Sequence, residues 1–192
     1  MKNKSLFISL PILVLLYISC NKISENVERD IIFKDSVFFD IPVLSSITDP
    51  YTLPDLQSAV SIGDQINNQV KGFTTDHIKQ IKITSLNMLL GITEKDKNGR
   101  DSIDTQNNFG NLETVKWEIT NGADTNLVGS ASVSSTGVLS TLAIPLSIPP
   151  EILKPYLIGD TKKYRVIVKA KKATSKPMKV KTMAIYTVTL AK

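Results

Sequence analysis

The chain has very little cysteine and histidine: one of each in 192 residues, Cys20 and His77. A single cysteine cannot form a disulfide within one chain, and one cysteine with one histidine cannot supply the four ligands of a structural zinc site. A nucleophile–histidine site needs a base held by a second group, and Asp76, beside His77, would point to the opposite face of a strand. We therefore interpret Thr75-Asp76-His77 as a turn into the next strand and expect neither a metal site nor a cofactor.

Motifs of enzyme families are also missing. The sequence contains no G-x-S-x-G elbow, no phosphate-binding loop and no dinucleotide fingerprint. No repeat of fixed period is present, which argues against solenoids and propellers. We expect that the protein is not an enzyme. A hydrolase whose paired carboxylates lie far apart in the sequence is the open alternative, because one sequence does not reveal their separation in space.

One acidic segment carries several oxygen ligands of the kind that calcium binds. Asp96, Asn98, Asp101 and Asp104 lie close together in EKDKNGRDSID. An EF-hand loop requires glycine at its sixth position and glutamate at its twelfth, and counting from Asp96 those positions hold Asp101 and Asn107. We interpret the segment as a solvated hairpin tip, with a non-standard calcium loop as the alternative.

Long hydrophobic runs are absent except at the N-terminus. MKNKS carries Lys2 and Lys4 without an acid, and the thirteen residues LFISLPILVLLYI follow. As a helix that run would rise roughly 20 Å, which is short for a bilayer core of about 30 Å. A positive start, a short apolar run and then the small residue Ser19 are the parts of an export signal.

Tyr17-Ile18-Ser19-Cys20 resembles the lipobox of bacterial lipoproteins, although that family usually has leucine where Tyr17 stands. The resemblance implies that residues 1–19 are a signal peptide cut by signal peptidase II, and that Cys20 carries a diacylglyceryl group and an acylated amine, for example with palmitate. Asn21 after the cysteine implies the outer membrane of a Gram-negative cell envelope, with the leaflet left open. A secreted protein with a chance cysteine, or an uncleaved anchor, is the alternative. Two or more acyl chains hold a protein firmly to a membrane.

The remaining 173 residues suit one globular domain, since the chain is 42% hydrophobic and 21% charged. Residues 20–30 are polar and are predicted to be a flexible tether, with a single domain over 31–192. Strands are predicted where apolar residues alternate, around 37–43, 77–92, 115–119, 164–171 and 179–190. Helical segments are predicted over 56–71 and in a short turn near 147–157 that Pro155 cuts short.

These patterns predict an all-β, mainly antiparallel β-sandwich of seven or eight strands with one or two short helices. Residues 126–146, with Gly137 near the centre, are predicted to form a hairpin, and residues 164–190 a second one.

Charge is distributed unevenly. Residues 161–192 carry ten Lys or Arg and no acid, whereas residues 20–160 carry eleven basic and eighteen acidic groups. In the predicted last hairpin one face collects the basic residues Arg165, Lys169, Lys171, Lys179 and Lys181. Such a face attracts an anionic glycan or a lipid headgroup. The alternative is a solvated face whose lysines discourage aggregation. Nucleic acid is not expected, because no interleaved aromatics accompany the basic residues.

We therefore predict a lipid-anchored β-sandwich lipoprotein of the cell envelope that acts as a binding, adhesive or structural module. Its partners would be the membrane, reached through the N-terminal lipid, and an anionic glycan, a lipid headgroup or an envelope protein. Besides the hydrolase, the second alternative is a carrier with an apolar cavity between its sheets, suggested by Met88, Leu89 and Leu90. For these three residues we favour an ordinary core role.

Overall fold

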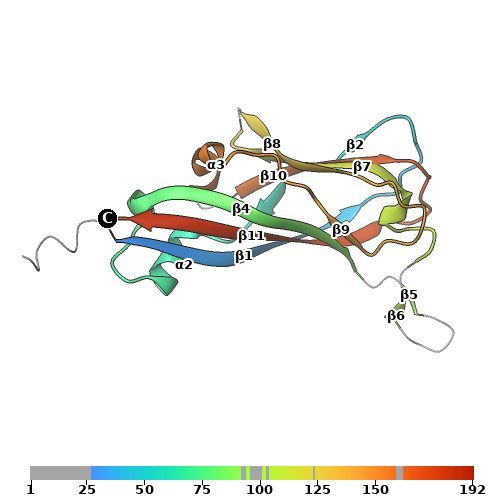
Figure 1. The fold of residues 1–192 in the computed structure, drawn as a ribbon. Coiled ribbons are helices and arrows are strands. Elements are labelled where there is room, and N and C mark those ends of the chain that lie inside the picture. The colour runs from blue at the N-terminus through green and yellow to red at the C-terminus, as the bar shows by residue number, and fades with distance from the viewer. Residues whose placement is uncertain (1–26, 92–93, 96–100, 103, 123, 159–161) are drawn as a thin grey trace, which may run out of the picture.

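The chain folds into two packed antiparallel sheets, which confirms the all-β prediction (Figure 1). The structure is a computed structural model and describes residues 27–91, 94–95, 101–102, 104–122, 124–158 and 162–192. In order, the first sheet, sheet A, contains β1 (Glu28–Ile41), β11 (Met178–Ala191), β4 (Ile78–Leu90) and β9 (Thr141–Ala143). Sheet B contains β2 (Tyr51–Thr52), β10 (Lys162–Ala170), β7 (Leu112–Thr120) and β8 (Thr125–Ser132), and β3 (Leu56–Ser58) also pairs with β10. The described part of the chain thus has nine strands in the two sheets, plus the short pair β5 (Glu94–Lys95) and β6 (Asp101–Ser102).

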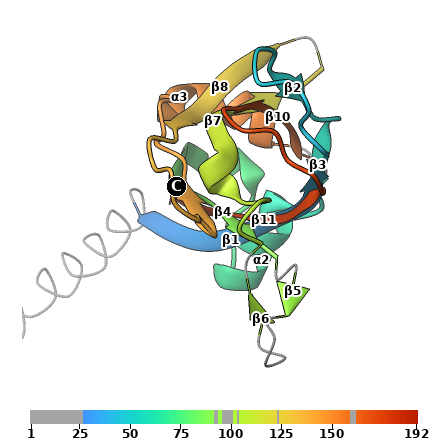
Figure 2. The same cartoon turned by 90° about the vertical axis from the view of Figure 1, so that its right-hand side faces the viewer.

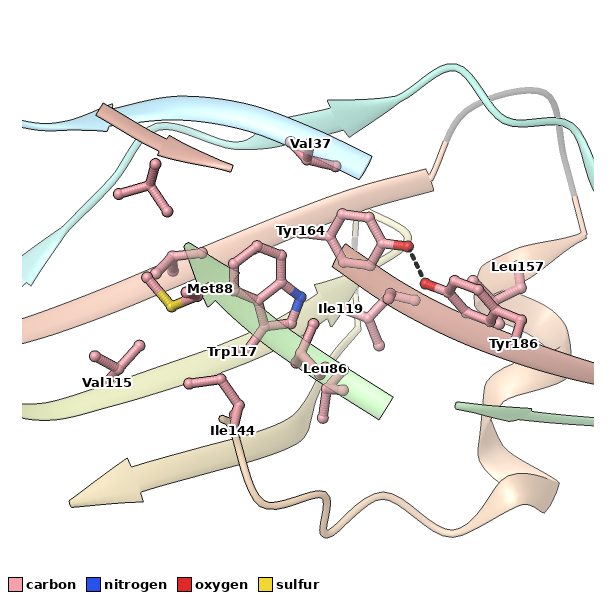
Figure 3. Packing of buried hydrophobic residues seen from close by; sticks show 14 of the residues in the cluster. Val37, Leu86, Met88, Val115, Trp117, Ile119, Ile144, Leu157, Tyr164 and Tyr186 are labelled. Atoms are coloured by element: carbon pink, nitrogen blue, oxygen red, sulfur yellow. Dashed lines mark hydrogen bonds between the residues drawn. The ribbon is translucent and has the colours of Figure 1, made fainter. Parts of the chain in front are cut away.

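Alternation along the strands builds the core. In β10 and β11 every second side chain is buried, as expected for strands with one face on the core and one toward water. The inward side chains of the two sheets meet around Trp117, with Met88 and Tyr186 also fully buried (Figure 3). Trp117 stacks obliquely on Tyr164 at 5.6 Å between ring centroids. Met88 and Leu90 are core residues, as expected, whereas the core role expected for Leu89 is wrong, because its side chain points outward.

Both predicted hairpins are wrong, although their strands are present. β10 pairs with β7, β2 and β3, whereas β11 pairs with β1 and β4, so the two strands lie in different sheets. Likewise β8 pairs with β7 in sheet B and β9 with β4 in sheet A, so of the predicted pairing over 126–146 only one antiparallel bridge, Gly129 with Leu146, is present in the described residues. Alternation identifies a half-buried strand but not its partner, and the segments between these strands are long enough to cross from one sheet to the other.

The helices are shorter or longer than predicted. Helix α2 (Ile62–Gln69) begins after Ser61, whose hydroxyl accepts a hydrogen bond from Asp64 N at 3.3 Å. The predicted helix over 56–71 starts later because residues 56–58 pair with β10 as β3. Helix α3 (Pro150–Leu157) has a proline in its first turn but passes through Pro155, because its last residues are buried against the core. Two 3₁₀ turns, η1 (Thr75–His77) and η2 (Phe109–Asn111), precede β4 and β7.

The sandwich has two distinct ends. Glu28 at the start of β1 pairs with Ala191 at the end of β11, so the first strand begins beside the C-terminus, near α2 (Figure 1). The predicted tether therefore ends by residue 27, because residues 28–30 already belong to β1. The β5–β6 pair lies at the opposite end, and the end-on view in Figure 2 shows the two sheets enclosing the core. Of the helices described, none has the length and apolar character needed to cross a bilayer.

Candidate functional site

Some of the predicted site residues lie outside the part of the chain that the structure describes. Cys20, Asp96 and Asn98 are among them, and Asp101 is described only as part of β6. Asp104 is buried, and its carboxylate accepts hydrogen bonds from Asn107 Nδ2 at 2.6 Å and Gln106 N at 2.8 Å. The hydrogen bond from Asn107 is the main cause that lowers the pKa of Asp104. Within the described ranges no group of three or more His, Cys, Asp or Glu side chains gathers as a metal site.

The predicted single basic face does not form. Arg165 and Lys169 point outward from β10 in sheet B, whereas Lys179 and Lys181 point outward from β11 in sheet A. The outer faces of two stacked sheets point in opposite directions, so these pairs lie on opposite sides of the molecule. Lys171 follows β10 and donates hydrogen bonds to the Val133 and Ser135 carbonyls at 2.8 and 2.5 Å. The prediction failed because it rested on the wrong hairpin.

On sheet B the basic side chains have acidic neighbours. Arg165 Nε lies 3.5 Å from Asp55 Oδ1, and Lys169 Nζ lies 2.8 Å from Glu113 Oε2. Such pairs at the surface neutralise each other's charge while contributing little stability. The outer face of sheet B is therefore closer to the solvated alternative than to an anion-binding face.

His77 has the structural role predicted for it. Its Nδ1 accepts a hydrogen bond from Thr74 N at 3.0 Å and closes the turn η1. The imidazole also meets the edge of the Phe73 ring at 5.5 Å between centroids. These contacts fix the entry into β4 and involve no second catalytic group.

A largely apolar groove crosses the outer face of sheet A at the end remote from Glu28, and we call it the β1–β11–β4 groove. Its volume is about 480 Å³, within the range of small-molecule sites. It is lined by Phe38, Phe39, Asp40, Leu89, Leu90, Gly91, Lys179, Val180 and Lys181. Phe38 is 71% exposed to solvent, an unusual position for a large aromatic side chain.

Register explains how the groove is built. Phe38 of β1 lies opposite Lys181 of β11, which in turn lies opposite Leu89 of β4, so these three side chains share the outer face. Lys181 Nζ lies 5.4 Å from the centre of the Phe38 ring, a cation–π contact. Asp40 lies opposite Lys179 in the same way. Lys181 is left without a carboxylate partner among the described residues.

The chemistry of this groove fits an amphipathic anion. Phe38 and Leu89 offer apolar surface, whose removal from water is favourable by roughly 25 cal/mol per Å². Lys181 offers a positive charge between these two apolar side chains. Together they suit a molecule that has an apolar body and one negatively charged group.

A second pocket of about 390 Å³ lies between residues 105–111 and 172–175. Polar groups in and beside its lining are already engaged. Asn111 Nδ2 donates a hydrogen bond to the Gln106 carbonyl, and Asn107 Oδ1, beside the lining, accepts hydrogen bonds from Ser175 N at 2.7 Å and Lys176 N at 2.9 Å. Asn108 in the same way accepts from Gly110 N at 2.8 Å. These bonds hold two loops together, so we assign this pocket a structural role.

A buried polar cluster lies between the sheets, where β1 of sheet A meets β3 and β10 of sheet B. Asp35 Oδ1 accepts a hydrogen bond from Ser58 Oγ at 2.7 Å, and Tyr164 Oη lies 3.5 Å from Asp35 Oδ2. Lys162 Nζ lies 3.7 Å from the same Oδ2. Tyr164 and Tyr186 share a hydrogen bond of 2.5 Å between their hydroxyls (Figure 3).

Burial perturbs the titratable groups of this cluster. Loss of solvent lowers the pKa of Lys162, and the charge of Asp35 opposes that shift only in part. Burial raises the pKa values of both Tyr164 and Tyr186, which therefore stay protonated at neutral pH. The alternation of apolar residues in the sequence predicts that Tyr164 and Tyr186 point inward. Nothing in the sequence indicates that Asp35 and Lys162 lie next to each other.

One feature of the sequence points to the groove: an apolar residue at an outward position of a strand. Phe38 stands between the inward Val37 and Phe39, and Leu89 between the inward Met88 and Leu90. Single exposed apolar residues are common, so this signal is weak until pairing brings two of them together.

Comparison with protein-family models finds no match, and comparison with curated proteins finds none either. Among solved structures, the crystal structure of FlhE matches with a TM-score of 0.27 and 6% identity, over 85% of this chain and 98% of that one. Desmodium yellow mottle tymovirus matches with a TM-score of 0.28 and 15% identity, over 85% of this chain and 90% of that one. At such TM-scores neither likeness bears on the function of this chain.

Proposed function

We infer that the chain is a lipid-anchored binding module of the cell envelope, held at the outer membrane through Cys20. The lipobox resemblance at residues 17–20 supports the anchor. The β1–β11–β4 groove is the observation that favours binding over a purely adhesive or structural role. The partner we propose is an amphipathic anion, for example a long-chain carboxylate.

The position of the groove suits this arrangement. Phe38 lies ten residues along β1 from Glu28, about 33 Å at roughly 3.3 Å per residue. A tether joining Cys20 to Glu28 would attach at the other end of the same strand. The groove would then open away from the point of attachment, where a partner can reach it.

The anchor is tested by metabolic labelling with a palmitate analogue. Wild-type protein should be labelled and the Cys20→Ala variant should not. Equal absence of label in both would remove the anchor from the proposal and leave the groove unaffected.

The groove is tested by photo-crosslinking of the full chain with a diazirine-bearing long-chain carboxylate, followed by peptide mass spectrometry. Crosslinks should fall on residues 38–40, 89–91 and 179–181, and excess unlabelled carboxylate should compete. The corresponding neutral methyl ester should compete more weakly, because Lys181 no longer meets a negative charge.

The two alternatives gain less support. A carrier cavity between the sheets would occupy the space that Trp117, Met88 and Tyr186 fill, so the apolar-ligand idea moves from the interior to the outer groove. The hydrolase stays a prediction, and no observation on the described residues favours it.

A further inference from the structure

Asp35 and Lys162 form a lysine–carboxylate pair that is almost completely removed from solvent. Their side chains are 2% and 1% exposed, and Nζ lies 3.7 Å from Oδ2. Lys162 Nζ also donates a hydrogen bond to the Val60 carbonyl. Removing both charges from water costs several kcal/mol per ion, which their mutual attraction repays only with excellent geometry. Loss of both charges therefore removes this desolvation cost.

Proton transfer within the pair removes both charges. Desolvation lowers the pKa of Lys162, which favours the neutral amine, and Asp35 Oδ2 is the nearest carboxylate oxygen to receive the proton. A neutral amine is a nucleophile, and a carboxylic acid is the group it condenses with. We propose that Lys162 Nζ attacks Asp35 Cγ and that the two side chains condense to an amide, which links sheet A covalently to sheet B.

The reaction balances without any further reagent. The Nζ–Cγ bond forms and the Cγ–Oδ2 bond breaks. Starting from the ion pair, two hydrogens leave Nζ and depart with Oδ2 as one molecule of water. No electrons are gained or lost, so neither an oxidant nor a reductant is needed.

Two hydroxyls are placed to assist this step. Ser58 Oγ donates to Asp35 Oδ1 at 2.7 Å, and Oδ1 is the oxygen that becomes negatively charged when Cγ is attacked. Tyr164 Oη lies 3.5 Å from Oδ2, the leaving oxygen, and can donate a proton to it. Tyr186 holds the Tyr164 hydroxyl from the other side at 2.5 Å.

The link would bear on how the molecule withstands force. Asp35 lies in the middle of β1, the strand that begins at Glu28. Force applied through an N-terminal anchor would enter β1 at Glu28, and an amide at Asp35 would stop the strand from peeling further. This consequence rests on the proposed anchor, whereas the link itself does not.

Tryptic digestion of folded wild-type protein, after denaturation, tests the link directly. The expected species is the peptide that starts at Asp35 joined to a peptide containing an uncleaved Lys162, one water lighter than the two together. If folded wild-type protein yields only separate peptides, with cleavage after Lys162, the pair is an ion pair and the proposal is overturned.

Variants separate the roles of the neighbours. Lys162→Arg should abolish the linked peptide, whereas Lys163→Arg, on the adjacent outward position, should keep it. In a pulse-chase time course that starts from newly synthesised chain, Ser58→Ala should slow linking on the order of 10²-fold to 10³-fold and Tyr164→Phe on the order of 10²-fold. Wild-type rates in both variants would overturn the roles given to these hydroxyls.

Discussion

Strand β10 carries two lysine–carboxylate pairs, one on each side of its sheet. Lys162 faces inward and meets Asp35, with exposures of 1% and 2%, whereas Lys169 faces outward and meets Glu113, with exposures of 31% and 44%. The residue types are the same and the strand is the same. Because of this difference in solvent access, removing one partner of the inner pair should destabilise the sandwich strongly, whereas removing one partner of the outer pair should cost little. Lys181 of β11 gives a third arrangement: a partly exposed lysine beside an apolar groove, with no carboxylate partner in the part of the chain that the structure describes.

Breaking the inner pair should have the largest effect. Lys162→Met leaves Asp35 buried with neither a cation nor an amide link, and the free energy of unfolding should fall by at least roughly 3–5 kcal/mol. Urea denaturation followed by circular dichroism measures this. The matched change on the outer side, Glu113→Gln, should cost less than about 1 kcal/mol. Similar losses in the two variants would contradict the comparison.

Alkaline pH tests the same interior through its tyrosines. Burial raises the pKa values of Tyr164 and Tyr186, so above the ordinary value of about 10 they ionise only when the chain unfolds. Their contribution to stability is fully present below pH 10 and is lost as the pH rises above it. Tyr186→Phe should reduce that pH dependence by about 1.4 kcal/mol per pH unit.

The control for this pH series is Tyr51→Phe, because the Tyr51 side chain is exposed. It should leave the slope of unfolding free energy against pH unchanged. If Tyr186→Phe also leaves the slope unchanged, the hydroxyl of Tyr186 is not shielded as the structure indicates.

Removing the aromatic wall of the groove should weaken partner binding by an intermediate amount. Phe38→Ser should lower the apparent affinity for the photoreactive carboxylate about tenfold, which corresponds to about 1.4 kcal/mol. Ile32→Ser is the matched control, since Ile32 is 62% exposed on the same strand but outside the groove lining. Equal losses in both variants would indicate general adhesion to sheet A rather than a site.

Removing the charge of Lys181 should have the smallest effect. Lys181→Gln should lower the apparent affinity about twofold to fivefold, as expected for a partly exposed charge interaction worth about 0.4–1 kcal/mol. The loss should shrink as salt is raised. Lys169→Gln on sheet B should leave binding unchanged at every salt concentration.

The sequence predicted the strands well because alternation is a local property. β7, with Val115, Trp117 and Ile119 inward, and β4 were predicted from their own residues. Pairing is not local, and for this reason alternation alone predicts a hairpin of β10 and β11 that the structure does not contain.

The candidate site was less predictable for the same reason. The predicted basic face depended on the wrong hairpin. Its lysines lie on opposite sides of the sandwich because β10 and β11 belong to different sheets. The groove requires Phe38, Lys181 and Leu89 to lie side by side, and they come from three strands far apart in the chain. The Asp35–Lys162 pair likewise depends on how the two sheets stack.

We propose that the partner binds the outer face of sheet A and not that of sheet B. Photo-crosslinking of the full chain with the diazirine-bearing carboxylate, mapped by peptide, tests it most directly. Competed crosslinks are expected on residues 38–40, 89–91 and 179–181. Competed crosslinks on residues 163–169 of sheet B, or crosslinks that excess carboxylate fails to reduce, would contradict it.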